Sequence, residues 1–404
     1  MAAHGAPSYR ARQVFHALYQ QGVATAEAMT ELPAALRRAL TNQFAVGTVA
    51  PIEQRQSADG TAKWLVRLAD GQSVETVLIP TLARRTVCVS TQVGCAYACA
   101  FCASGQAGFR RNLTAGEIVQ QVLLVQRFLW SEEVVALGPG PREGVRPGRQ
   151  LRRPSGHGVP AASFGEAKRA GTSEAEHRSD SDPRWGSPSG AGRTTPSRGA
   201  ARRVTHVVCM GMGEPLANYE SLLKAIRVLN APEGLRIGAR RITISTVGLV
   251  PMIERLSREG LQIELSVSLH APNDALRGTL MPVNAKYPLD QLIPACRAYT
   301  QATKRLITFE YILIDHVNDG VPEARQLAER LVGLSCKVNL IPCHPIPGTT
   351  WARPPAARMH AFARTLRQGG VPCTLRRSRG LDIEGACGQL RLRHLGAARA
   401  APAR

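Results

Sequence analysis

No stretch of the 404-residue sequence approaches the roughly 18 consecutive apolar residues that a membrane-spanning helix requires. The first residues, MAAHGAPSYRARQ, also lack the charged and then apolar pattern of a signal peptide. These absences predict a cytoplasmic protein that does not bind a membrane. Disulfides are rare in that compartment, so the ten cysteines are expected to be metal ligands or catalytic thiols rather than a disulfide framework.

Acidic residues are few: 30 Asp and Glu stand against 51 Lys and Arg, which gives a formal net charge of +21. Segment 131–203 contains 13 of the basic and 8 of the acidic residues, so +16 remains in the rest of the chain. Such a charge suggests a polyanionic partner, most simply nucleic acid. A coding bias that replaces lysine with arginine is the alternative, and charge alone does not decide between them.

Segment 131–203 also has few of the residues that build a core. It has 12 Gly, 8 Pro and 9 Ser in 73 residues, and it has no Ile, Tyr, Met or Cys. It cannot bury enough apolar surface to offset the ordering of its backbone, so we expect a disordered insertion. A long surface loop costs little closure entropy, so the surrounding domain can fold around it.

The N-terminal part of the chain, residues 1–50, is predicted to be a small helical accessory domain, because helical periodicity runs through residues 8–45. Residues 51–85 are expected to form a short β extension. Polar and apolar residues alternate in its string AKWLVRLADGQSVETVLIP, where Asp70-Gly71 is typical of a hairpin turn.

Between residues 86 and 390 a strand followed by a helix recurs six times. The expected strands are 86–93, 204–211, 241–247, 263–269, 306–314 and 337–342. Amphipathic helices lie between them, and the first, 113–129, begins with a capping box of Thr114 and Glu117. Apolar strands alternating with such helices favour an α/β fold, here a partial six-stranded (β/α) barrel related to the (β/α)8 type. The basic tail 391–404 is expected to fray.

Four cysteines lie within the fifteen residues CVSTQVGCAYACAFC, and Cys95, Cys99 and Cys102 have C-x3-C-x2-C spacing. Structural zinc sites usually have two CxxC-type pairs or histidines at ligand spacing, and neither follows here. Three thiolates on one loop suit three irons of a 4Fe-4S cluster, with the fourth iron open to a non-protein ligand. A zinc-stabilised RNA-binding protein without catalytic activity is an alternative, but it needs a fourth ligand nearby.

A second motif, GMGEP, occupies residues 211–215 directly after the second expected strand. It lies at the C-terminal end of that strand, which is the active face of βα barrels. Glycines there would expose backbone donors and acceptors to a ligand, and Glu214 could hold an ammonium group. A short glycine motif is weak alone, but here it follows C-x3-C-x2-C by one βα unit.

With these two motifs the sequence resembles the radical S-adenosylmethionine (SAM) superfamily. Within that superfamily, several longer strings resemble the RNA adenine methyltransferases known as RlmN, with Cfr as sister group: CVSTQVGCAYACAFCASGQAGFRRNLTAGEIVQQV, VVCMGMGEPLANY, RRITISTVGLVP, SVSLHAPND and GLDIEGACGQL. The resemblance runs from about residue 8 to residue 390 and is interrupted by 131–203. It implies a radical SAM barrel that uses a 4Fe-4S cluster and SAM.

The resemblance also implies the ligands of both cofactors. Cys95, Cys99 and Cys102 match the cluster ligands of the family. The residues that match its SAM contacts are Gly213, Glu214, Ser245, Ser268, Leu269, His270 and His344. His344 departs from the pattern, since it stands in IPCHP where the family usually has Asn. An imidazole can still donate or accept a hydrogen bond.

Three further residues match catalytic positions of the family. In its reaction a cysteine, here Cys387, is methylated by one SAM, and a radical from a second SAM removes hydrogen from that methyl group. The resulting methylene radical adds to adenine and joins protein to RNA. Cys88 then attacks the Cys387 sulfur, which releases the product and leaves a disulfide. Glu75 matches the proton acceptor.

The resemblance implies C2 methylation of an adenosine in 23S rRNA and of a tRNA anticodon-loop adenosine. Bases in such loops can be splayed out and recognised singly. A reductant such as a flavodoxin system and a monomeric enzyme are expected. C8 methylation of 23S rRNA, as in the Cfr group, is the alternative; that group tends to have Ala after GMGE, where this chain has Pro215.

Overall fold

The computed structural model describes residue 1 and residues 5–44, 47, 49–131, 203–344, 349–383 and 385–400. Except for its two end residues, the segment 131–203, for which disorder was predicted, lies outside the described residues. The predicted domain boundaries stay predictions.

The N-terminal residues form two helices, α1 (Tyr9–Tyr19) and α2 (Ala34–Gln43), as the periodicity predicts. They have a small hydrophobic cluster of their own, made of Ala17, Ala26, Met29, Leu32, Leu36 and Leu40. This cluster is separate from the large core that surrounds the sheet.

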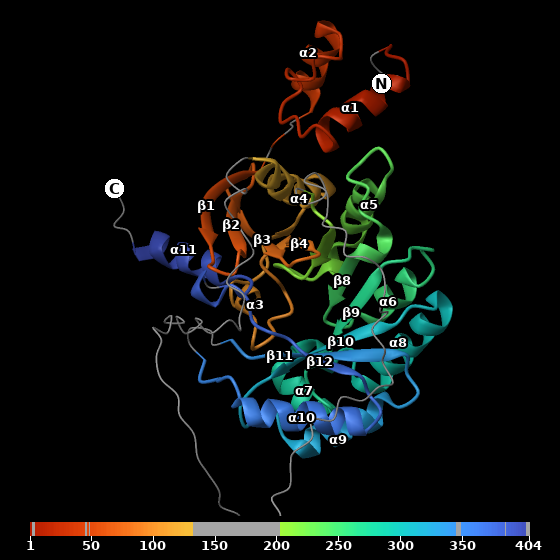
Figure 1. Ribbon diagram of the computed structural model, residues 1–404, viewed down its shortest axis with the longest axis vertical. Coiled ribbons are helices and arrows are strands. Elements are labelled where there is room, and N and C mark those ends of the chain that lie inside the picture. The colour runs from red at the N-terminus through yellow and green to blue at the C-terminus, as the bar shows by residue number, and fades with distance from the viewer. Residues whose placement is uncertain are drawn as a thin grey trace, which may run out of the picture. The chain divides into compact units, whose positions relative to one another are not determined.

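One mixed sheet runs through the described part of the chain (Figure 1), in the order β1-β2-β3-β4-β7-β8-β9-β10-β11-β12. Its strands are β1 (Ala50–Gln56), β2 (Ala62–Arg67), β3 (Ser73–Pro80), β4 (Arg85–Cys88), β7 (His206–Cys209), β8 (Ile242–Thr246), β9 (Glu264–Ser268), β10 (Ile307–Leu313), β11 (Cys336–Pro342) and β12 (Cys373–Leu375). The strands β1 to β4 pair antiparallel, and all pairs from β4 to β12 are parallel.

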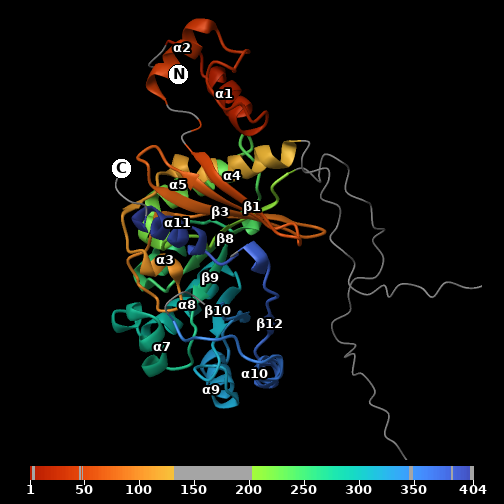
Figure 2. The same cartoon turned by 90° about the vertical axis from the view of Figure 1, so that its left-hand side faces the viewer.

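Helices follow the parallel strands along the chain. They are α3 (Ala103–Gln106), α4 (Ala115–Trp130), α5 (Tyr219–Asn230), α6 (Val250–Leu256), α7 (Asp274–Leu280), α8 (Leu289–Thr303), α9 (Val321–Leu331), α10 (Ala356–Gln368) and α11 (Gln389–Ala400). The predicted capping box of Thr114 and Glu117 begins α4 and is complete in both directions. The two views agree in placing α11 next to α3 (Figures 1 and 2), and these helices pack together.

All six predicted barrel strands are confirmed, but the first is divided in two and a further strand, β12, extends the sheet. The expected strand 86–93 ends at Cys88, because the backbone of Ser90 exchanges hydrogen bonds with the Gln121 side chain of α4 instead of a strand. Its last residues form β5 (Gln92–Val93), which pairs with β6 (Arg111–Asn112) in a separate small sheet. The addition is β12, a strand too short for its alternation to be recognised.

The barrel is partial, as predicted: in the described chain β1 and β12 stand at opposite ends of the sheet and do not pair. Its parallel strands alternate rather than being apolar throughout. In β8, Ile242 and Ile244 are fully buried in the core, whereas Thr243 and Ser245 are half-buried. Apolar side chains thus pack under the helices, and polar side chains line the open inner face.

Two further expectations concern the surface of the molecule. Across the residues that the structure describes, we find no helix with the length and apolar character needed to cross a membrane. The prediction that the basic tail frays is wrong for residues 391–400, which belong to α11. The start of this helix is anchored by a buried carboxylate, as described below, which sequence periodicity does not reveal.

Candidate active site

The three cysteines of the C-x3-C-x2-C motif lie on the loop between β5 and α3. The N–H of Cys95 donates to the carbonyl of Gly108 at 3.2 Å, which holds the two sides of the loop together. The N–H of Cys102 donates to the carbonyl of Cys99 at 3.0 Å, so these two cysteines share one tight turn. Cys95 and Cys99 are buried and Cys102 is half-buried.

The electrostatics of these thiols fit a cationic centre. Burial raises the pKa of Cys95 to about 12, and burial also raises the pKa values of Cys99 and Cys102. Cys102 and Cys95 further raise the pKa of Cys99, which shows that the thiols lie within electrostatic range of one another. Bound cations reverse this effect and deprotonate such thiols. The donor set therefore fits an iron cluster.

The described residues do not form a compact site for a single metal ion. Over the described residues, no group of three or more His, Cys, Asp or Glu side chains could hold one metal ion. A structural zinc ion requires such a group. A 4Fe-4S cluster does not, because each cysteine binds a different iron.

The glycines of GMGEP are required by close packing. A Cβ on Gly211 would lie 2.6 Å from the carbonyl oxygen of Val89, and one on Gly213 would lie 2.4 Å from Cβ of Gln92. The N–H of Gly211 donates to Val89, and the N–H of Glu214 donates to the Gln92 side chain at 2.8 Å. The expectation that these glycines expose backbone donors to a ligand is therefore wrong for Gly211, whose N–H is used within the protein.

Glu214 is a buried carboxylate without a cationic partner among the described side chains. Its two oxygens accept from the backbone N–H groups of Leu216 at 3.0 Å and Val247 at 2.8 Å. Burial raises the pKa of Glu214 to about 7, and these hydrogen bonds only partly oppose the rise. A ligand ammonium group would supply the missing positive charge, so the carboxylate fits the amino group of SAM.

The other residues that match SAM contacts lie at the C-terminal ends of the parallel strands, as expected. Ser245 and Ser268 stand in the last two residues of β8 and β9 and are half-buried, as is His344 two residues beyond β11. Leu269 follows β9, but its side chain is fully buried in the core. Its N–H donates to the Glu310 carbonyl of β10 at 3.0 Å.

His270 links this row to the cysteine loop. Its Nδ1 accepts from the N–H of Ile312 at 2.9 Å, so in the neutral ring the proton lies on Nε2. Burial, followed by the charge of Arg277, lowers the pKa of His270 to about 3, which keeps the ring neutral. Phe101 of the cysteine loop stacks edge-on against it at 4.5 Å between ring centroids.

Sequence reasoning missed Arg277, a fully buried side chain behind the same strand ends. Its guanidinium donates to the carbonyls of Val247 at 2.8 Å and Ser268 at 3.4 Å, and to Asn284 at 2.8 Å. It therefore fixes the C-terminal ends of β8 and β9, which carry predicted SAM contacts. Its position in the amphipathic helix α7 carries no signal that distinguishes it from a surface arginine.

The structure brings Cys88 and Cys387 together. A hydrogen bond between the two side chains is the largest influence on both thiols, and it lowers the pKa of Cys88 and raises that of Cys387. The Cys387 thiol also donates to the carbonyl of Met210 at 3.3 Å. Gly388 packs so closely on α3 that a Cβ there would lie 2.8 Å from the backbone nitrogen of Ser104. The Cys387 loop therefore lies between Cys88 and the helix that follows Cys102.

Glu75 lies in the same place, on β3. It is buried and forms an ion pair with Lys63 at 2.8 Å. Its oxygens also accept from the backbone N–H groups of Gly388 and Arg391, both at 2.8 Å. A predicted proton acceptor thus also anchors the start of α11. The sequence offered no sign of Lys63, because a lysine in an alternating strand is usually solvated.

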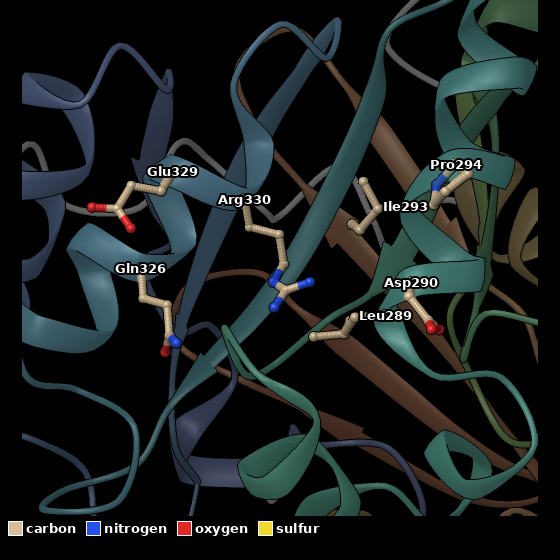
Figure 3. A pocket seen from close by; sticks show the side chains of 7 residues that line it. All are labelled: Leu289, Asp290, Ile293, Pro294, Gln326, Glu329 and Arg330. Atoms are coloured by element: carbon tan, nitrogen blue, oxygen red, sulfur yellow. The ribbon is translucent and has the colours of Figure 1, made fainter.

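Two surface hollows lie elsewhere. One of about 450 Å³ lies between α8 and α9 (Figure 3), and the other, of about 480 Å³, lies on α10. In Figure 3 Arg330 of α9 extends toward Leu289 and Asp290 of α8. Neither hollow is lined by a predicted site residue. We place the candidate site at the C-terminal ends of the parallel strands, where the cysteine loop, Glu214 and His270 lie.

Comparisons with known proteins identify the relatives of this chain. The Radical SAM superfamily pattern matches residues 182–328, and the ribosomal RNA large subunit methyltransferase N-terminal domain matches residues 1–46. A "Probable dual-specificity RNA methyltransferase RlmN" from Desulforudis audaxviator is 43% identical over 378 residues, which cover 93% of this chain and 96% of the relative. The "Dual-specificity RNA methyltransferase RlmN" of Syntrophobacter fumaroxidans is 40% identical over 386 residues, covering 96% and 92%.

This chain belongs to the RlmN family of radical SAM methyltransferases. The crystal structure of a radical SAM methyltransferase from Sphaerobacter thermophilus has the same fold, with a TM-score of 0.77 and 43% identity over 96% of this chain and 94% of that one. As a member of the RlmN family the protein is an enzyme whose cofactors are a 4Fe-4S cluster and SAM. The alternative of a non-catalytic, zinc-stabilised protein is wrong.

Proposed function

We propose that the enzyme methylates C2 of one adenosine in 23S rRNA and of an adenosine in tRNA anticodon loops. The observation that carries the proposal is the placement of Cys387, whose thiol contacts Cys88 while its loop packs on the helix after Cys102. Adenine C2 is electrophilic and cannot attack a methyl donor as a nucleophile. A protein sulfur that first takes the methyl group, beside a radical source, removes this obstacle.

Cys95, Cys99 and Cys102 would hold the cluster, and Glu214 would hold the SAM ammonium group. When bound, the cluster and SAM supply a methyl group and, from a second SAM, a hydrogen-abstracting radical. Ser245, Ser268 and His270 would orient the ligand from the strand ends, together with Gly213 and the backbone of Leu269. His344 would contribute an imidazole where the family usually has an amide.

The remaining steps fall to three side chains that touch one another or share one loop. Cys387 carries the methyl group and, after hydrogen abstraction, the bond to adenine. After addition, the adduct would return its unpaired electron to the cluster, and Glu75 takes the proton from C2. A carboxylate accepts about four hydrogen bonds, and three are used here. Cys88 attacks the sulfur of Cys387, which frees the methylated RNA and forms a disulfide. Reduction of that disulfide restores the enzyme.

RNA as the partner accords with the net charge of +16 outside residues 131–203. We assign residues 1–50 to an accessory domain that helps to bind RNA, 51–85 to a β extension and 86–390 to the catalytic core. The basic segment 391–404 would add phosphate contacts. A cytoplasmic monomer reduced by a flavodoxin-type system completes the proposal.

The test is anaerobic incubation of the reconstituted enzyme with SAM, a reductant and unmodified 23S rRNA or tRNA, followed by nucleoside mass spectrometry. We expect 2-methyladenosine from the wild type and none from Cys387→Ala. A matched control is Cys296→Ala, since Cys296 is a fully buried cysteine of α8 outside the site. It should retain activity.

C8 methylation is the second candidate, and the two differ in the product. An 8-methyladenosine product would place the enzyme with the Cfr group. Pro215, which starts a 3-10 helix directly after Glu214, favours C2, because the Cfr group tends to have Ala there. Cleavage of SAM without any methylated nucleoside would overturn the RNA assignment.

A further inference from the structure

Lys63 of β2 is fully buried, which is rare for lysine unless its charge is paired. Its ammonium group lies 2.8 Å from Oε2 of Glu75 and donates to the carbonyl of Ala386 at 2.8 Å. These contacts join Lys63 to the proposed proton acceptor and to the residue immediately before Cys387.

Strand register explains how Lys63 reaches this place. Lys63 stands opposite Val77 of β3, and Val77 stands opposite Cys88 of β4. Residues directly opposite one another share a face of the sheet, as do residues two apart in a strand. Lys63, Cys88 and Glu75 therefore project from one face, over which the Cys387 loop lies.

The two charged groups of this face hold the Cys387 loop on both sides of the cysteine. Lys63 bonds the carbonyl of Ala386, before it, and Glu75 accepts from the N–H groups of Gly388 and Arg391, after it. The ammonium group of Lys63 donates to a carbonyl, and the carboxylate of Glu75 accepts from N–H groups. The 2.8 Å ion pair joins the two side chains. With both neighbours fixed, the thiol has little freedom to leave Cys88.

We propose that Lys63 is a positioning residue for methyl transfer to Cys387: it fixes the loop at Ala386 and neutralises Glu75 beneath the thiol. This inference rests on the proposed role of Cys387 as methyl carrier. The hydrogen bond with Cys88, burial, and the charges of Cys88 and Glu75 raise the pKa of Cys387, and the charge of Lys63 opposes that rise. The same ammonium therefore favours the reactive thiolate.

The experiment measures two reactions of the same holoenzyme. In the first, without reductant, SAM methylates Cys387: the thiol loses its proton to solvent, a sulfur–carbon bond forms, and S-adenosylhomocysteine leaves. Peptide mass spectrometry follows the methyl group. In the second, dithionite supplies the electron for reductive cleavage of SAM, and the release of methionine is measured, because it does not require a hydrogen atom from the Cys387 methyl group.

In Lys63→Met we expect Cys387 methylation to slow at least tenfold, while methionine release by reductive cleavage stays within threefold of wild type. The pH profile of the methylation rate should also shift to higher pH. Lys337→Met is the matched control, because Lys337 is an exposed lysine on β11 of the same sheet. It should leave both reactions unchanged.

Unimpaired Cys387 methylation in Lys63→Met would overturn the inference, as would an equal loss of both reactions with a lower melting temperature. If that variant does not fold, Lys63→Met/Glu75→Gln, which removes both buried charges, should fold. It should still cleave SAM and methylate Cys387 poorly; recovered methylation would overturn the inference. If wild-type Cys387 is never methylated, the proposed function fails instead.

Discussion

We predict that SAM binding depends on pH, because Glu214, the carboxylate that we propose as the partner of its ammonium group, is buried. Burial raises the pKa of this carboxyl to about 7 from 4.5. An ammonium group binds the ionised form, so below pH 7 part of the binding energy is spent on removing a proton. For a single group with that pKa, the dissociation constant is about 25-fold higher at pH 5.5 than at pH 7.5.

Calorimetry with S-adenosylhomocysteine checks this prediction, because that ligand has the amino group of SAM but no methyl to transfer. Glu214→Gln is the control: its affinity should be lower at pH 7.5 and nearly the same at both pH values. His270 does not interfere, since its pKa of about 3 keeps it neutral throughout. An affinity of the wild type that does not change between pH 5.5 and 7.5 would refute the reasoning.

Three further substitutions test other parts of the structure. Thr114→Ala removes the capping hydrogen bond of α4 and should lower the free energy of unfolding by about 1 kcal/mol in denaturant titration, without loss of activity. Gly388→Ala should slow Cys387 methylation more than tenfold, because the new Cβ would collide with Ser104, but the affinity for S-adenosylhomocysteine should stay within twofold. Gly370→Ala is the control, because Gly370 has a similar φ and open space around it. Arg277→Met leaves buried carbonyls without donors and should lower the free energy of unfolding by about 3 kcal/mol or more, which an unchanged denaturation midpoint would contradict.

The strand and helix order was predictable because it depends on local periodicity. Strand β7 before GMGEP and the capping box of Thr114 both depend on residues that are close together in the sequence. The division of the first strand was not predictable, since it depends on Gln121, a polar residue of a helix that reaches back to Ser90. Such contacts between residues far apart in sequence leave no periodic trace.

The site shows the same contrast. The spacing of Cys95, Cys99 and Cys102 points to a cluster by itself, whereas the meeting of Cys88 with Cys387 could be expected only through the family resemblance. The expectation for Gly211 was wrong for a related reason. Gly211 allows two backbone segments to pack closely, and in sequence such a glycine looks the same as one in a ligand-binding turn.

The β extension is joined to the catalytic residues more closely than its place before the barrel suggests. Its strands β2 and β3 supply Lys63 and Glu75, and the pairing of β3 with β4 aligns them with Cys88. The loop that returns from the far end of the sheet is then anchored to that face through Ala386 and its neighbours. A barrel without the extension would keep its cysteine motif and strand ends, but it would lack the face that holds Cys387 in place. The antiparallel strands therefore belong to the proposed active site as much as the parallel ones.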